Sequence, residues 1–431
     1  MHDIAHTADD ETAAFGPFDR FLRQQLLGQM GGLRHGRLLL EDACGTVALG
    51  LPATAHTDLH IHLQIFDPGF YRAVARNGSV GAGESYMEGQ WRCDNLVGLI
   101  QLLVRNRDLL DGMENGWARL GGMALRGWHA LRRNTRDGSR RNIAAHYDLG
   151  NDFFSLFLSP DLMYSSAIWT DPTDTLETAS ARKLERICRK LDLRSTDRVI
   201  EIGTGWGGFA LYAATHYGCH VTTTTISREQ HALASERVAA AGLTEQVTLL
   251  LEDYRDLDGH YDKLVSIEMV EAIGAPYLDR YFEKLGSLLK PDGLALVQAI
   301  TIEDQRYEQA LKSVDFIKRH VFPGSFIPSI NALLAAKTHA SDLGLIQLED
   351  FGNSYALTLK AWRERFMSKL AQVRAQGFDE RFIRMWEFYL AYCEGGFRER
   401  SIGVANLLLA KPGHRHAAPL PEFAAPVELP A

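Results

Sequence analysis

The stretch VIEIGTGWGGF, residues 199–209, leads an apolar strand directly into a glycine-rich turn. Gly203, Gly205 and Gly208 fit the G-x-G-x-x-G pattern of a dinucleotide-binding turn. Such a site also needs an acidic residue about twenty positions later, which binds the ribose. The sequence there reads TTTTIS, residues 222–227, and contains no carboxylate. A redox nucleotide is therefore a poor match to this turn.

The residues around the turn alternate between strand-like and helical patterns. Apolar and β-branched runs predict strands at 198–202, 220–226, 247–251, 262–269, 294–300 and 404–410. Amphipathic runs predict helices at 183–191, 208–217, 229–241 and 277–289. Strands and helices that alternate at this spacing indicate an α/β fold with a doubly wound, mostly parallel sheet.

S-adenosylmethionine matches the turn better than a dinucleotide does. It has no phosphate, so the glycines would serve to let the backbone approach the amino-acid end of the ligand. Glu201 precedes the turn, and Asp253 and Tyr254 follow the third strand, where an adenine needs a polar edge and an apolar face. A turn LKPDG, residues 289–293, comes before the fifth strand, as is common in class I methyltransferases. Because these motifs occur in this order along the chain, they together predict S-adenosylmethionine as the cofactor.

Composition and turn residues suggest how the chain is divided. We expect a flexible tail at 1–16, a small α+β domain at 17–115, a basic helix and linker at 116–142, the cofactor-binding domain at 143–412 and a second flexible tail at 413–431. Within the large domain, residues 302–400 are expected to form a mostly helical insertion that covers the substrate.

Charge and cysteine content limit the classes of partner. The 431 residues carry a formal net charge of −8, which argues against a general nucleic-acid binder. Seven arginines and one acid lie between Arg119 and Arg141, which fits either a lipid-facing helix or a solvated one. Five cysteines without a C-x-x-C pair suggest reduced thiols, and no apolar run reaches the ~20 residues of a spanning helix. We therefore expect a cytoplasmic protein that acts on lipid, if at all, from the water side.

Three histidines invite a metal interpretation, which we do not favour. His60 and His62 share one face of an alternating strand, and His56 lies just before it. The sequence places no acid or cysteine beside them, so no metal is expected.

Seven further motifs along the chain are similar to those of one enzyme family. They are HYDLGNDFF (146–154), MYSSAIW (163–169), TTISREQ (224–230), MVEAIG (269–274), FPGSFIPS (322–329), DFGNSYALTLKAW (350–362) and YLAYCEGGFR (389–398). With the glycine turn, they resemble the cyclopropane-fatty-acyl-phospholipid synthase family of S-adenosylmethionine-dependent enzymes. GESYMEGQW at 83–91 resembles the longer bacterial members, so the similarity covers nearly all of the chain except its ends. A homodimer is expected from the resemblance alone.

The resemblance also implies where the ligands bind. The residues it assigns to the cofactor are Tyr164, Ser165, Glu201, Gly203, Gly205, Gly207, Thr225, Ile226, Ser227, Gln230, Asp253 and Tyr254. Family members act on a cis double bond of a phospholipid acyl chain, and aromatic side chains would shield the cation that forms. The candidates for these shielding side chains, or for the lining of a tunnel that binds the acyl chain, are Trp169, Phe316, Phe322 and Phe326.

The catalytic site departs from the family pattern. The family holds a bicarbonate ion with a cysteine, a glutamate, a histidine, a tyrosine and a backbone group. The glutamate, tyrosine and backbone positions are Glu271, Tyr355 and Ile300, whereas the cysteine and histidine positions are Ser166 and Gln298. A histidine that usually follows the glutamate is Ala272 here. Serine and glutamine could still hold an anion, and Glu271 could itself act as the base.

These changes leave the product open. Cyclopropane is the family default, and a methyl-branched or methylene lipid is the rival, because the changed site could remove a different proton. A small-molecule amine methyltransferase and a non-catalytic paralogue that binds lipid or a partner remain alternatives. The leading hypothesis is methyl transfer to unsaturated phospholipids at the inner face of the membrane, with which the protein would be peripherally associated.

Overall fold

The computed structural model describes residues 15–50, 59–109 and 149–415. The basic segment 116–142 therefore lies outside the described residues, as do most of both predicted tails and the HYD part, 146–148, of the 146–154 motif. Backbone contacts divide the chain into two compact units. The first unit contains 1–158, 301–329 and 352–403, and the second contains 159–300, 330–351 and 404–431.

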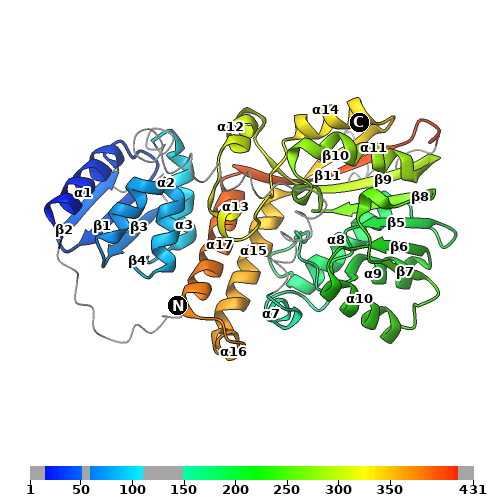
Figure 1. The fold of residues 1–431 in the computed structure, drawn as a ribbon, viewed down its shortest axis with the longest axis horizontal. Coiled ribbons are helices and arrows are strands. Elements are labelled where there is room, and N and C mark those ends of the chain that lie inside the picture. Colours follow the sequence, from blue (N-terminus) through cyan, green and yellow to red (C-terminus); the bar gives the residue numbers. More distant parts are fainter. Residues whose placement is uncertain (1–14, 51–58, 110–148, 416–431) are drawn as a thin grey trace, which may run out of the picture. The chain divides into compact units, whose positions relative to one another are not determined.

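The second unit is built around one seven-stranded sheet, in the order β10-β11-β9-β8-β5-β6-β7 (Figure 1). Its strands are β5 (Arg198–Ile202), β6 (His220–Thr224), β7 (Val247–Leu250), β8 (Tyr261–Ile267), β9 (Leu289–Ile302), β10 (Gly344–Asp350) and β11 (Ile402–Ala410). The five strands β5 to β9 pair in parallel. This confirms the doubly wound, mostly parallel sheet that the alternating pattern predicts.

Helices flank this sheet. They are α8 (Leu176–Lys190), α9 (Gly208–Tyr217), α10 (Arg228–Ala240), α11 (Leu278–Leu288) and α14 (Ile330–Ala340), with short 3-10 turns η1 (Tyr254–Asp256), η2 (Val270–Ala272) and η3 (Ala275–Tyr277). Apolar side chains of α8 and α9 pack on β5 and β6 in a continuous core that includes Ile187, Phe209 and Val221, all fully buried. Burial of this kind contributes about 25 cal/mol per Å² and holds the helices to the sheet.

The sheet topology brings several chain segments to one edge. Because β5, β6, β8 and β9 run in parallel, their carboxyl ends lie at the same side of the sheet. Residues just past or near these ends are Gly203 after β5, Thr225 after β6, Glu268 after β8, and Ile300 in β9. Ligands of open α/β sheets bind at this edge, so the fold itself gathers the predicted site residues of this unit.

Two details of the sheet differ from the sequence prediction. The expected turn KPDG at 290–293 is a bulge inside β9, because Tyr261 pairs with Leu289 whereas Lys263 pairs with Leu294. The proline there has no N–H to donate to a ladder, and Lys290 donates to Asp262 at 2.6 Å. The second difference is β10, a strand within the segment expected to be mostly helical. It pairs antiparallel with β11, and its outward Leu345 and Leu348 stay 39 % exposed, which hides the usual strand alternation.

The first unit contains a four-stranded sheet in the order β2-β1-β3-β4. Its elements are α1 (Pro17–Met30), β1 (Arg37–Asp42), β2 (Gly45–Gly50), β3 (His60–Ile65), α2 (Gly69–Met87), β4 (Trp91–Cys93) and α3 (Leu96–Arg105). These strands and helices lie within the segment 17–115, for which a small α+β domain was expected. His62 lies opposite Leu39 on β1, and its Nε2 is 2.7 Å from Glu41 Oε2. Contrary to the sequence argument, an acidic residue therefore does lie beside His62. The contact joins these two side chains.

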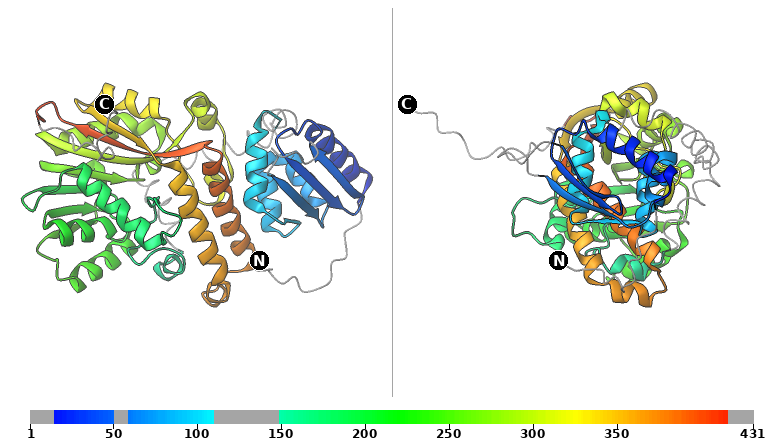
Figure 2. Two further views of the ribbon diagram at one scale, coloured as in Figure 1. Left: turned by 180° about the vertical axis from the view of Figure 1, so that it is seen from behind. Right: turned by 90° about the vertical axis from the view of Figure 1, so that its left-hand side faces the viewer.

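Helices from later in the chain complete the first unit. They are α7 (Asn151–Ser155), η4 (Asp304–Arg306), α12 (Tyr307–Lys312), α13 (Phe316–His320), α15 (Gly352–Ser368), α16 (Leu370–Ala375) and α17 (Glu380–Arg398). Helices α15 and α17 lie side by side (Figure 2). An aromatic cluster joins α7 to them, with Phe153 packed edge-on against Phe366 and Trp386. None of the helices in the described residues has the length and hydropathy needed to cross a membrane.

Candidate active site

The glycine turn after β5 adopts backbone angles that favour glycine. Gly203, Gly205 and Gly207 have φ of 97°, 53° and 84°, all in the left-handed region. The backbone N–H groups of Gly203 and Thr204 donate to the carbonyl of Thr224, which ties the turn to the end of β6. A Cβ added at Gly205 would have no other atom of the described residues within 4 Å. The turn is therefore rigidly held and leaves room for a ligand to approach its backbone.

The start of α9 is packed much more tightly. A Cβ at Gly208 would come 2.7 Å from the carbonyl oxygen of Asp161 and still closer to the Met163 sulfur. The third glycine of the pattern thus allows helix α9 to contact the segment that leads into MYSSAIW.

Glu201 lies on the central strand β5 with its carboxyl group enclosed. Thr223 Oγ1 on β6 donates to Glu201 Oε2 at 2.6 Å, and Thr204 Oγ1 lies 2.5 Å from the same hydroxyl. Burial raises the pKa of Glu201 to about 8, because it penalises the ionised form. At neutral pH, and without a ligand, this group is protonated.

The loop after β6 is organised by its own side chains. Ser227 caps α10 by accepting from the N–H of Gln230, and Thr225 Oγ1 donates to Gln230 Oε1 at 2.9 Å. Ile226 between them is half-buried. The four residues thus form one ordered loop at the carboxyl edge of the sheet.

Asp253 and Tyr254, after β7, have partners that the sequence did not predict. Asp253 accepts two hydrogen bonds from the guanidinium of Arg255, at 2.8 and 2.6 Å, and also caps η1. Tyr254 packs edge-on against Tyr281, and burial raises its pKa to about 12. Both carboxylate oxygens of Asp253 are therefore already engaged in a buried ion pair, in which the Asp253 side chain is 5 % exposed and the Arg255 side chain 6 %.

A fully buried lysine lies beneath the MYSSAIW segment. Lys183 of α8 has no exposed surface, and its Nζ donates to Ser165 Oγ at 2.9 Å. Burial lowers its pKa to about 8, while the charges of Asp161, Glu268 and Glu201 act in the opposite direction. Its helical spacing is that of an ordinary amphipathic face, so no local pattern distinguishes this lysine from others.

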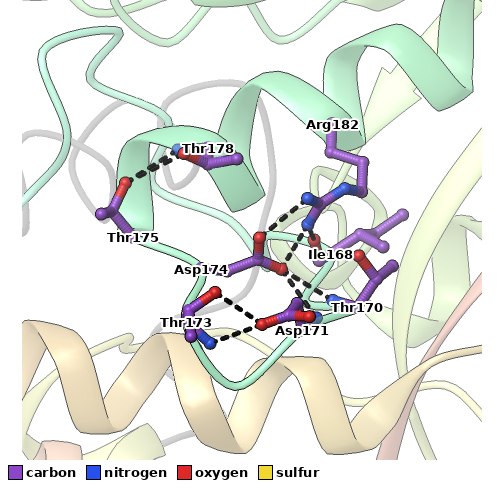
Figure 3. A network of polar contacts seen from close by, with 8 residues as sticks. All are labelled: Ile168, Thr170, Asp171, Thr173, Asp174, Thr175, Thr178 and Arg182. Carbon is purple, nitrogen blue, oxygen red and sulfur yellow. Dashed lines mark hydrogen bonds and ion pairs between the residues drawn. The ribbon is translucent and has the colours of Figure 1, made fainter.

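The end of MYSSAIW is fixed by a network at the start of α8 (Figure 3). Arg182 donates to both oxygens of Asp174, at 2.5 and 2.8 Å, and to the carbonyl of Ile168 at 3.1 Å. The carboxylate also accepts from the backbone N–H groups of Thr170 and Asp171. This network holds the loop that follows Trp169, which is itself half-buried.

The predicted anion site contains a carboxylate of the chain. Glu268, just past β8, accepts with the single oxygen Oε1 from the backbone N–H of Ser166 at 2.9 Å and from Gln298 Nε2 at 2.7 Å. Its own backbone N–H donates to the carbonyl of Gln298 at 2.8 Å. Ser166 directs its hydroxyl to the carbonyl of Ala167 instead. Sequence reasoning missed Glu268, although it lies three residues before Glu271.

Glu271 lies next to this arrangement. Its Oε1 accepts from the backbone N–H of Ile300 at 2.5 Å, and both positions are ones that the resemblance assigns to the anion site. Burial, and then the charge of Glu268, raise the pKa of Glu271 to about 8. Among the described residues, neither Glu271 Oε2 nor Gln298 Oε1 has a hydrogen-bond partner, although both atoms are enclosed. Enclosed polar atoms without a partner are uncommon in folded proteins, and a bound group or a water molecule would satisfy them.

The remaining candidates belong to the first unit, and each is described there by itself. Tyr355 of α15 is 6 % exposed and packs against Trp362 and Phe397. Phe316 of α13 is buried against Phe388, and Phe326 is also buried, whereas Phe322 is half-buried beside Tyr389. The packing of Phe316 is that of a core residue.

The parallel sheet, the glycine turn and the loops at its carboxyl edge are those of a class I methyltransferase fold, and the family and its relatives show an S-adenosylmethionine-dependent methyltransferase. The chain belongs to the mycolic acid cyclopropane synthetase family, whose model matches residues 134–407.

Three relatives illustrate this similarity. Tuberculostearic acid methyltransferase of Mycobacterium tuberculosis is 39 % identical over 79 % of this chain and 81 % of its own length. Cyclopropane-fatty-acyl-phospholipid synthase of Escherichia coli K12 is 38 % identical over 81 % of this chain and 87 % of its own length. The solved mycolic acid cyclopropane synthase CmaA1, in complex with SAH and CTAB, is 28 % identical with a TM-score of 0.59, covering 63 % of this chain and 98 % of that one.

Proposed function

We propose that the protein transfers a one-carbon group from S-adenosylmethionine to a cis double bond in the acyl chain of a membrane phospholipid. The product is an acyl chain one CH2 heavier, with either a cyclopropane ring or a methyl or methylene branch. Relatives named for each kind of product have nearly equal identity to this chain, 39 % and 38 %.

One observation carries the proposal: two glutamate side chains that meet at the carboxyl ends of β8 and β9. An alkylated olefin is a carbocation, and it needs nearby negative charge and a base that accepts the proton it loses. Glu268 and Glu271 bring two carboxyl groups to that edge, and the Glu271 Oε2 atom is enclosed, with no hydrogen-bond partner among the described residues. Methylation of an amine, in contrast, uses the lone pair of the deprotonated nitrogen and forms no carbocation.

The cofactor is assigned to the opposite part of the same edge. The open space at Gly205 suits an approach of the ligand to the backbone of the turn. We assign it to Tyr164, Ser165, Glu201, Gly203, Gly205, Gly207, Thr225, Ile226, Ser227, Gln230, Asp253 and Tyr254. Lys183 joins this group as a positioning residue, because its ammonium group anchors the hydroxyl of Ser165.

The acyl chain is assigned to Trp169, Phe322 and Phe326, whereas Phe316 is better explained by core packing. Tyr355 remains the proposed hydroxyl donor of the reaction. We further propose that the protein acts as a homodimer at the cytoplasmic face of the membrane, where the arginines of 116–142 attract anionic lipid.

The test is incubation of the purified protein with S-adenosylmethionine carrying a labelled methyl group and vesicles of an unsaturated phospholipid. Label is expected in the acyl chains after hydrolysis, and NMR of the methyl esters then distinguishes a ring from a branch. Saturated phospholipid vesicles are the control and should take up no label. Label in the headgroup fraction alone would instead support an amine methyltransferase.

A further inference from the structure

At the predicted bicarbonate site, two hydrogen-bond donors are already occupied by the chain. The backbone N–H of Ser166 and the side-chain amide of Gln298 both donate to Glu268 Oε1. A bicarbonate ion in the same place would have to displace this carboxylate. The residues present therefore do not fit a bound bicarbonate.

The backbone of Glu268 shows that the arrangement is specifically built. Its φ is 49°, in the left-handed region where side chains other than glycine are uncommon. The conformation is fixed by the backbone N–H of Glu268, which donates to the carbonyl of Gln298 on the neighbouring strand. This turn directs the Glu268 side chain back toward the amide of the same glutamine.

The charges around Glu268 suit a proton acceptor. The charge of Lys183 interacts with that of Glu268, and burial, together with the charge of Glu268, raises the pKa of Glu271 to about 8. The raised pKa of Glu271 favours its protonated form, which lessens the repulsion between the two neighbouring carboxyl groups. Glu268 is only partly buried as a residue, whereas Gln298 has no exposed surface.

We propose that Glu268 is the catalytic base of the reaction and replaces a bicarbonate ion with a carboxylate of the protein. This rests on the proposed function. The olefin π pair bonds to the methyl carbon as the sulfur–carbon bond breaks, its electrons remaining on the sulfur of S-adenosylhomocysteine. A C–H bond of the transferred methyl then breaks and its pair closes the ring, or, after a hydride shift along the chain, forms a double bond. The proton passes to Glu268.

Two variants separate this role from a structural one. Glu268→Gln keeps an oxygen that accepts from Ser166 and Gln298 but has no basicity, so kcat should fall about 10²–10⁴-fold while the Kd for S-adenosylmethionine is unchanged. Glu268→Gly removes the carboxylate, suits the positive φ and frees both donors. It should be inactive in CO2-depleted buffer and recover activity when bicarbonate is added.

Binding provides a readout that does not depend on turnover. NMR with 13C-labelled bicarbonate should show binding to the Glu268→Gly protein and none to the wild type. Wild-type activity should be the same with and without bicarbonate. Wild-type turnover that requires bicarbonate, or a Glu268→Gln variant with full activity, would overturn the inference and leave the proposed function standing. No lipid product from the wild type in either buffer would instead overturn the proposed function and the inference with it.

Discussion

Glu201 illustrates how much a single position in a motif can predict. Its place two residues before the first glycine indicated that it lies near the cofactor turn, and the structure places it at the end of β5. Its protonation could not be predicted, because the pKa depends on burial by α8 and β6, which are distant in sequence. The same applies to Lys183 and Glu268, whose importance comes from contacts rather than from local pattern.

The buried acid makes folding depend on pH. The unfolded chain releases the Glu201 proton near 4.5, whereas the folded protein keeps it to about 8. The contribution of Glu201 to the free energy of unfolding is therefore fully present below its unfolded-state pKa of 4.5 and decreases as the pH rises towards about 8. Glu201→Gln does not titrate in this range. Its free energy of unfolding, relative to that of the wild type, should therefore rise by on the order of 1–3 kcal/mol between pH 6 and pH 8. Urea unfolding at the two pH values measures this, and an equal loss in both proteins would contradict it.

Gly205 allows ligand approach to be separated from backbone strain. It and Gly242 have φ of 53° and 71°, and at neither would a new Cβ meet another atom of the described residues within 4 Å. Alanine at either position should cost about 1–2 kcal/mol of stability. Calorimetry should show weaker S-adenosylmethionine binding, by at least about tenfold, only for Gly205→Ala. Equal affinities in the two variants would show that the ligand does not approach this turn.

At the scale of elements, sequence pattern predicted the strands of the parallel sheet well, because β5 and β9 are buried over most of their length and the others are rich in apolar and β-branched residues. It missed β10, whose leucines remain partly exposed at the edge, and it took the bulge in β9 for a turn. Both errors concern pairing with a distant strand, which local pattern does not encode. The loop before α8 is a similar case, since its order comes from Asp174 and Arg182.

Asp174→Asn should loosen this loop. Arg182 and two backbone N–H groups hold the pKa of Asp174 well below its ordinary value, so its contribution is present above about pH 4 and lost in acid. Faster amide hydrogen exchange is expected in residues 168–174, together with a lower kcat, because Trp169 precedes the loop. Arg189→Gln, which removes the exposed Glu185 pair on the same helix, is the control and should change neither. Unchanged exchange in Asp174→Asn would refute the role of the network.

At the scale of the whole molecule, the family motifs predicted more than the physical patterns did, because they are spread over both units. Tyr355 belongs to the first unit and Glu271 to the second, and no periodicity connects residues so far apart. The boundaries expected from composition also differ from the contact units, which group α15 and α17 with the N-terminal sheet. Long-range packing decides such groupings, and the composition of a segment does not report it.

Membrane binding should depend on the arginines of the 116–142 segment. Changing Arg132, Arg133, Arg140 and Arg141 to glutamine should weaken co-sedimentation with anionic vesicles by about 1 kcal/mol per residue near the surface, an effect that salt should mimic. The same number of exposed arginines elsewhere, Arg20, Arg76, Arg228 and Arg280, gives a control with equal net charge. If both variants bind vesicles equally well, the segment is not the lipid contact.

The most direct test of methyl transfer to an acyl olefin uses S-adenosylmethionine with a trideuterated methyl group and vesicles of an unsaturated phospholipid. Mass spectrometry of the released fatty acids should find an added carbon that carries deuterium. Two of the three deuterons remain in a cyclopropane or methylene product, whose lost proton comes from the transferred methyl, and all three remain in a methyl-branched product whose lost proton comes from the chain. Acyl chains free of deuterium, with the label on a headgroup nitrogen or a small molecule, would contradict the account.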